Sequence, residues 1–178
     1  MNRLYSIIIV FLGFSWCTAC GQKTFDEKMQ SLYQNTVPLI KFDELKKMKD
    51  QGEVYLLDTR APEEFAVSHL PGAALIDYDN FKKTDVKDIP KDAKVVVYCS
   101  VGYRSERIGE KLQKMGFTDV SNLYGGIFDW KNQGNTVINT EDMPTDSVHT
   151  YNENWSQWLY KGIKFYKKKT RLSAYPLC

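Results

Sequence analysis

The chain has 178 residues, of which 13% are aromatic and 26% are charged, and its formal net charge is +2. This length suffices for one domain with a hydrophobic core, and the composition is ordinary for a folded protein. The near balance of charge excludes an electrostatic argument for nucleic-acid binding, and the sequence contains no internal repeat or low-complexity tract.

The N-terminus has the pattern of a targeting segment. A single early cation, Arg3, precedes an apolar run over residues 7–14, which has the length of a signal-peptide core and is short for a membrane span. Two small residues, Thr18 and Ala19, stand directly before Cys20. This order of features resembles the bacterial lipoprotein signal.

The resemblance implies a signal peptide over residues 1–19 and a lipid on Cys20, with residues 20–35 as the lipidated cysteine and its tether. It departs from the usual signal at Cys17, where a leucine-like residue is expected. The implied location is the bacterial cell envelope, lipid-anchored to a membrane and facing the periplasm or the exterior. An uncleaved anchor helix and a plain secretion signal are the alternatives.

From residue 37 onward, strand and helix patterns alternate. Phe42, Leu45 and Met48 recur at helical spacing before Gly52, and an apolar strand follows that ends at Asp58. Further strands are predicted over 73–76, 94–98 and 120–123, and further helices from Pro62, over 105–116 and after Gly125. This alternation predicts an α/β fold with a central, mostly parallel sheet and helices on both faces.

Cys99 lies at the carboxyl end of the most apolar predicted strand, where ligands bind in sheets of this kind. The loop that follows contains Gly102 and no proline before Arg104, so its amides can form an anion-binding nest at the start of the next helix. Such dipoles and a nearby arginine favour the thiolate form of a cysteine, which is the nucleophile. A buried, inert cysteine is the alternative interpretation.

Several separated motifs, in their order and spacing, resemble the single-domain rhodanese family. They are LLDTR, PEEFAVSHLPGA, VVVYCSVGYRS and LYGGIFDW. The resemblance implies a rhodanese-like three-layer domain over residues 36–134 and a persulfide carried by a catalytic Cys99. The implied persulfide-binding loop consists of Ser100, Val101, Gly102, Tyr103, Arg104 and Ser105, and the supporting residues are Asp58 and Arg60.

The expected reaction is sulfur transfer in two half-reactions. A small donor, thiosulfate or a persulfide, gives its sulfane sulfur to Cys99, and a thiol or cyanide acceptor then removes it. This chemistry needs no metal and no organic cofactor, and the sequence shows no zinc-like spacing of cysteine and histidine. Ser100 stands where thiosulfate-using members often have a basic residue. The missing positive charge argues against thiosulfate as the natural donor.

Two other functions compete with sulfur transfer. Cysteine phosphatases use a similar loop with one residue more between cysteine and arginine, whereas four residues separate Cys99 from Arg104. The tighter ring suits a single sulfur atom, and this favours sulfurtransferases over phosphatases and arsenate reductases. The second alternative is a catalytically idle rhodanese module that binds a partner protein at the cell envelope. The intact Cys99, Gly102 and Arg104 favour the enzyme.

Other polar residues near these motifs are interpreted as structural. Glu63 and Glu64, together with Asp58 and Arg60, are expected to form ion pairs that fix the loops, and His69 is expected to be a turn residue rather than a base.

The remaining segment, 135–178, is predicted to be an extension that packs on the domain. It starts as a polar loop and continues as a docked helix that ends near Gly162. The helix contains Trp155, Trp158, Leu159 and Tyr160. A surface for a partner protein or the membrane, helped by the lysines at 167–169, is the alternative. Cys99 and Cys178 are both expected to be reduced in the active form.

Overall fold

The computed structural model describes residues 23–166. The expected signal peptide, Cys20, the lysines at 167–169 and Cys178 lie outside the described residues. Within 23–166 there is no helix whose length and apolar character would allow it to cross a membrane.

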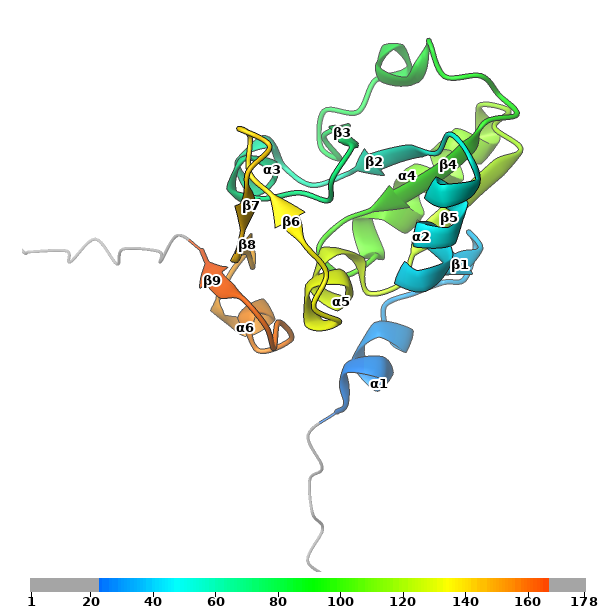
Figure 1. Cartoon of the computed structure of the whole chain (residues 1–178). Helices are drawn as coiled ribbons and strands as arrows, with labels where there is room; N and C mark the ends of the chain where they lie inside the picture. Colours follow the sequence, from blue (N-terminus) through cyan, green and yellow to red (C-terminus); the bar gives the residue numbers. More distant parts are fainter. Residues whose placement is uncertain (1–22, 167–178) are drawn as a thin grey trace, which may run out of the picture.

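The centre of the molecule is a five-stranded sheet in which every pairing is parallel (Figure 1). The strands, in the order β1-β5-β4-β2-β3 across the sheet, are Leu39–Ile40, Asp119–Leu123, Lys94–Tyr98, Tyr55–Asp58 and Ala73–Leu75. The helices connecting or preceding them are α1 (Phe25–Gln30), α2 (Phe42–Gln51), α3 (Pro62–Val67), α4 (Tyr103–Lys114) and α5 (Gly126–Asn132), with a short 3-10 helix at Lys83–Val86. The predicted α/β fold with a central, mostly parallel sheet is confirmed.

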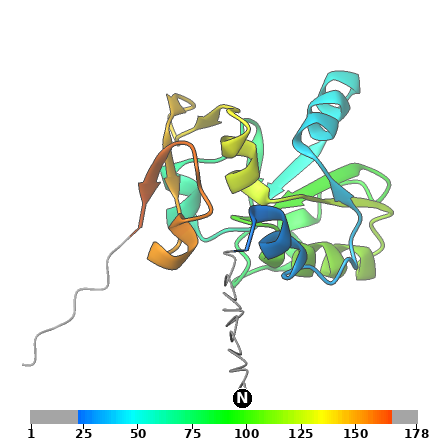
Figure 2. The same ribbon diagram turned by 90° about the horizontal axis from the view of Figure 1, so that it is seen from below.

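Both faces of the sheet are buried. Val96 and Tyr98 of β4 belong to one hydrophobic cluster, and the alternate residues Val95 and Val97 belong to another. The first cluster includes side chains from α1, α2 and α5, and the second includes side chains from α4. Figure 2 shows α2 and α5 on one side of the sheet and α4 on the other. Parallel strands covered on both faces are expected to be almost wholly apolar, as β4 is.

Helix α4 begins earlier than the sequence predicts. Its first residue is Tyr103 rather than Ser105, because Gly102 takes the left-handed conformation, with φ at +94°, and turns the chain directly into the helix. Arg104 therefore lies in the first helical turn and not in a loop.

The segment after Gly134 contains more strand than the sequence predicts. Strands β6 (Val137–Ile138) and β7 (Pro144–Thr145) form an antiparallel pair, and β8 (Ser147–His149) pairs with β9 (Ile163–Phe165) in parallel. Helix α6 (Glu153–Ser156) is a single turn, so the predicted docked helix is wrong in its extent.

A side chain of the domain ends that helix. Asn132 donates to the carbonyl of Trp158 at 3.0 Å and accepts from the amides of Tyr160 and Lys161 at 2.6 and 3.2 Å. Those amides are then not available for helical bonds, and Gly162, with φ at +101°, leads the chain into β9. Trp158 and Leu159 are nevertheless buried in the first hydrophobic cluster.

Candidate active site

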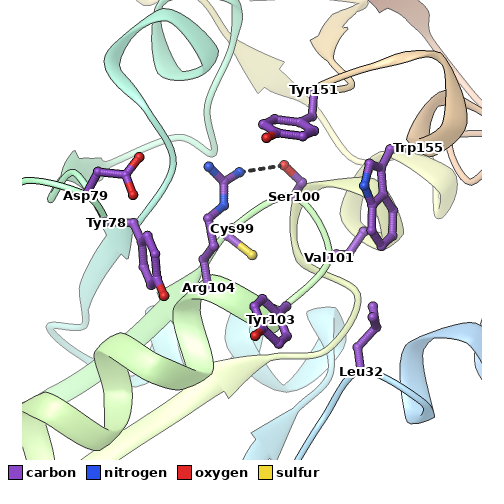
Figure 3. A pocket seen from close by; sticks show the side chains of 10 residues that line it. All are labelled: Leu32, Tyr78, Asp79, Cys99, Ser100, Val101, Tyr103, Arg104, Tyr151 and Trp155. Atoms are coloured by element: carbon purple, nitrogen blue, oxygen red, sulfur yellow. Dashed lines mark hydrogen bonds between the residues drawn. The ribbon is translucent and has the colours of Figure 1, made fainter.

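The site is built around Cys99, which follows the last residue of β4 and is 1% exposed. Within residues 23–166 its thiol has no disulfide partner, and Sγ accepts a hydrogen bond from the amide of Gly102 at 3.1 Å. The sulfur therefore lies at the amino-terminal end of the twelve-residue helix α4, where backbone N–H groups and the helix dipole favour negative charge. Figure 3 shows it at the centre of a pocket.

The carbonyls of the loop are held away from the sulfur. Each of the four successive carbonyls 99–102 accepts a hydrogen bond from a group outside the loop. The donors, in chain order of the carbonyls, are the amides of Ile127 and Phe128, the hydroxyl of Tyr33 and the side-chain amide of Asn122, at 2.9, 3.1, 2.7 and 2.9 Å. Within residues 23–166, the amides of Val101 and of 103–105 have no protein acceptor. These amides are the donors that a bound anion would use.

Two glycines allow this arrangement. A Cβ at Gly126 would lie 2.1 Å from the carbonyl oxygen of Cys99, and a Cβ at Gly102 would lie 2.6 Å from the hydroxyl of Tyr33. Both glycines have positive φ, which other residues adopt only with strain. The close approach of α5 to the loop thus depends on Gly126.

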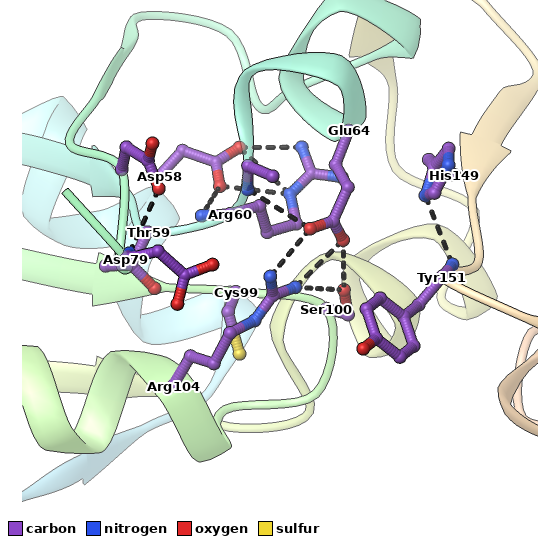
Figure 4. A network of polar contacts seen from close by, with 12 residues as sticks. Asp58, Thr59, Arg60, Glu64, Asp79, Cys99, Ser100, Arg104, His149 and Tyr151 are labelled. Carbon is purple, nitrogen blue, oxygen red and sulfur yellow. Dashed lines mark hydrogen bonds and ion pairs between the residues drawn. The ribbon is translucent and has the colours of Figure 1, made fainter.

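Arg104, Glu64 and Ser100 form a polar cluster beside the sulfur (Figure 4). The guanidinium of Arg104 donates to the two carboxylate oxygens of Glu64 at 2.6 and 2.8 Å and to the hydroxyl of Ser100 at 3.1 Å. The Ser100 hydroxyl in turn donates to Glu64 at 3.1 Å. The side chains of Arg104 and Glu64 are 20% and 2% exposed.

The two charged groups of this cluster shift each other's pKa values. Burial raises the pKa of Glu64, but the hydrogen bonds and charge of Arg104, with the charge of Arg60, outweigh burial and hold that pKa below its usual range. Burial lowers the pKa of Arg104, but the carboxylate of Glu64 and the nearby Cys99 outweigh it, so the pKa rises above its ordinary value. Arg104 therefore stays charged, and its hydrogen bonds go to Glu64 and Ser100.

The proposed supporting residues lie behind the pocket. Asp58 and Arg60 are both fully buried and form an ion pair at 2.6 Å, and Arg60 also donates to the carbonyl of Ser68 at 2.6 Å. This pair fixes the turn between β2 and α3. Helix α3 carries Glu64. His69 stacks on Phe65, with ring centroids 3.8 Å apart, and is not among the residues that line the pocket.

The pocket has a volume of about 480 Å³. Cys99, Ser100, Val101, Tyr103 and Arg104 of the predicted loop line it, whereas Gly102 and Ser105 do not. Its remaining lining residues are Leu32, Tyr78, Asp79, Tyr151 and Trp155. The sequence interpretation assigned none of these five to the site. It expected Glu64 to form an ion pair that fixes the loops, which the pairing with Arg104 bears out, but it did not place Glu64 beside Cys99. In the described part of the chain, no group of three or more histidine, cysteine or carboxylate side chains is arranged to bind a metal ion.

Known proteins are similar in sequence to the part of the chain that contains this site. A sulfurtransferase from Allochromatium vinosum is 34% identical over 95 residues, which are 53% of this chain and 88% of the relative. A tRNA uridine(34) hydroxylase from Cytophaga hutchinsonii is 39% identical over 88 residues, which are 47% of this chain but only 28% of the hydroxylase. This chain thus matches only one part of some of its relatives.

A solved structure has the same fold. A rhodanese-related protein from Thermoplasma volcanium superposes with a TM-score of 0.51 at 25% identity, covering 57% of this chain and 97% of that protein. The family described as Rhodanese-like domain matches residues 41–133, which include β2, α3, the Cys99 loop and α5. The chain belongs to the rhodanese-like family.

Proposed function

We propose that the protein is a sulfurtransferase that carries sulfane sulfur as a persulfide on Cys99. The observation that supports this most directly is the position of Sγ, which accepts from the Gly102 amide inside a loop whose carbonyls all face outward. The likeness to a relative named sulfurtransferase supports the same conclusion.

The reaction consists of two displacements at sulfur. The Cys99 thiolate attacks the outer sulfur of the donor, whose S–S bond breaks. The leaving group departs with the bonding electron pair, as sulfite from thiosulfate or as a thiolate from a persulfide. A thiolate or cyanide then attacks the outer sulfur of the Cys99 persulfide and regenerates the Cys99 thiolate. The free amides of Val101 and of 103–105 stabilise the negative charge of the persulfide.

Mass spectrometry of the full chain tests the proposal. After incubation with thiosulfate or an organic persulfide, we expect the mass to increase by one sulfur atom, and cyanide to remove that atom as thiocyanate. Cys99→Ser should gain no sulfur, because a serine hydroxyl cannot form a persulfide. It should keep its fold, because serine is nearly the same size as the buried cysteine that it replaces. Cys178→Ser serves as the matched control and should load normally.

Two results would contradict the proposal. If no donor adds sulfur to the wild-type protein, or if Cys99→Ser gains sulfur equally, the catalytically idle module that binds a partner protein becomes the better explanation.

We also propose that a lipid on Cys20 attaches the protein to a membrane of the bacterial cell envelope. Support comes from the apolar run over 7–14 and the small residues before Cys20. Cys20→Ala should move the protein from the membrane pellet to the soluble fraction, while Cys178→Ala should leave it in the pellet. Unchanged pelleting of Cys20→Ala would refute the lipid anchor.

A further inference from the structure

We infer that the sulfur donor of Cys99 is an organic molecule with an apolar, aromatic body rather than the small dianion thiosulfate. This inference rests on the proposed sulfur transfer and concerns the substrate class of the same pocket. Four features support it: the aromatic side chains around the sulfur, the balance of charge in the pocket, the segments that supply part of its lining, and the strained backbone of Tyr151.

Four aromatic side chains line the pocket around the sulfur. Tyr78, Tyr103, Tyr151 and Trp155 are spaced around Cys99, together with the apolar Leu32 (Figure 3). A volume of about 480 Å³ falls in the range of small-molecule sites, roughly 300–1,000 Å³. An anion of five heavy atoms would leave most of this space and most of the aromatic surface in contact with water.

The pocket offers no excess of positive charge. Its charged lining residues are Arg104 and Asp79, one of each sign. The charge of Arg104 is already matched by Glu64, to which it makes two hydrogen bonds. A dianion that enters this pocket would lose its hydration without gaining an unpaired cation.

Two further cations lie behind the walls. Arg107 lies 5.2 Å from the ring of Tyr103, and Lys111 lies 5.6 Å from the ring of Tyr78. Neither belongs to the pocket lining, and Arg107 is paired with Glu110 at 2.6 Å. They stabilise the tyrosine walls through cation–π contacts rather than binding an anion beside Cys99.

Part of the wall comes from segments that flank the matched domain. Leu32, Tyr151 and Trp155 all lie outside residues 41–133. The segments before and after the matched range thus place side chains in the lining of the pocket.

Tyr151 is held at the mouth at a cost in backbone energy. Its φ is +62°, a conformation that non-glycine residues rarely adopt. Its amide donates to Nδ1 of His149 at 3.1 Å, and its ring lies 6.0 Å from the guanidinium of Arg104. The side chain is 59% exposed, so a strained residue keeps a large aromatic surface uncovered beside the sulfur. Strain of this kind persists where the surrounding structure requires it, often at a ligand site.

Two matched donors test the substrate class. Methanethiosulfonate and benzenethiosulfonate carry the same reacting group and charge and differ in a methyl against a phenyl group. In both, the Cys99 thiolate attacks the sulfane sulfur, the S–S bond breaks, and the sulfinate leaves with the electron pair. We expect the ratio of kcat/KM for the phenyl donor over the methyl donor to fall about tenfold in Tyr151→Ala and in Trp155→Ala. Comparing the ratio between variants cancels the intrinsic reactivity of the two donors and any loss of rate that both donors share.

The control is Tyr160→Ala, which removes a 62% exposed aromatic from the same extension but outside the pocket lining. It should keep the wild-type ratio. Trp155→Phe tests the same wall with a smaller change if Trp155→Ala does not fold, as judged from its thermal unfolding.

The outcomes separate this inference from the proposed function. If sulfur loads on Cys99 but the ratio is the same in the wild type and both pocket variants, or if thiosulfate loads faster than the phenyl donor, the substrate class is wrong and sulfur transfer stands. If neither these three donors nor an organic persulfide loads Cys99, sulfur transfer itself is refuted, and the inference with it.

Discussion

At the scale of single residues, the hydroxyl of Tyr33 connects the Cys99 loop to the start of helix α5. The hydroxyl donates to the carbonyl of Val101 at 2.7 Å and accepts from the amide of Gly125 at 2.9 Å. Its ring also lies against Gly102. Burial raises the pKa of Tyr33 well above its ordinary value, so the hydroxyl keeps the proton that it donates.

Tyr33→Phe should therefore loosen the loop. The change leaves a buried carbonyl and a buried amide without partners, which should lower the free energy of unfolding by about 1–3 kcal/mol. Sulfur loading of Cys99 should slow by roughly tenfold or more, because the loop amides are then less well positioned. Tyr124→Phe, which removes a hydroxyl bonded to Asp26, is the control. Rapid-quench loading at a temperature where all variants are folded measures the effect, and a wild-type rate in Tyr33→Phe would exclude a positioning role.

Glu64 makes the stability of the site depend on pH. Its pKa in the folded protein lies below the ordinary carboxyl value, despite burial, because of Arg104 and Arg60. Its contribution to stability is therefore fully present above the unfolded pKa and is lost as the pH falls through the folded pKa. Because Arg104 is 20% exposed, Glu64→Gln should cost about 2–3 kcal/mol at pH 7, less than a fully buried pair.

Urea unfolding at several pH values measures this effect. The difference between wild type and Glu64→Gln should shrink as the pH falls below the ordinary carboxyl pKa and through the lowered pKa of Glu64 in the folded protein. Glu63→Gln changes the neighbouring exposed carboxylate and should be nearly neutral throughout. A Glu64→Gln difference that is independent of pH would show that the charge of Glu64 does not stabilise the fold.

At the scale of elements, the site depends on how closely helix α5 approaches the Cys99 loop. Gly126→Ala would place a Cβ 2.1 Å from the carbonyl of Cys99, whereas Gly116→Ala, also at positive φ, would meet no atom within 4 Å. Gly116→Ala should cost only the conformational strain, about 1–2 kcal/mol. Gly126→Ala should cost more and should also prevent normal sulfur loading. Thermal unfolding and mass analysis of both variants check this, and equal behaviour of the two would show that the close approach is unimportant.

The periodic elements could be predicted from the sequence, and the contacts between them could not. β4 and α4 have strong apolar patterns, so their type was predicted correctly, but the start of α4 depends on the φ of Gly102. Strands of two or three residues, such as β6 and β9, are too short to show a period. The carboxylate of Glu64 meets Arg104 across 40 residues of sequence, and nothing local distinguishes it from its neighbour Glu63.

At the scale of the whole molecule, the flanking segments and the matched domain share one hydrophobic cluster. Met29 before the domain and Val148, Trp158 and Leu159 after it are buried in the cluster that contains Tyr98. Helix α3, which carries Glu64, also lies against β8. The segments that supply the aromatic walls of the pocket are thus part of the folded core, and they should unfold together with it.

Leu159→Ala tests this shared core. Leu159 is fully buried in the extension, so its truncation should lower the free energy of unfolding of the whole molecule by about 2–5 kcal/mol. Tyr160→Ala, at the adjacent exposed position, should change it by less than about 0.5 kcal/mol. Urea unfolding followed by tryptophan fluorescence, to which Trp155 and Trp158 of the extension contribute, should coincide with unfolding followed by far-ultraviolet circular dichroism. If the extension folded by itself, Leu159→Ala would shift the fluorescence transition and leave the other in place. A single transition displaced as a whole is the expected result, because the cluster around Leu159 includes residues of the central sheet.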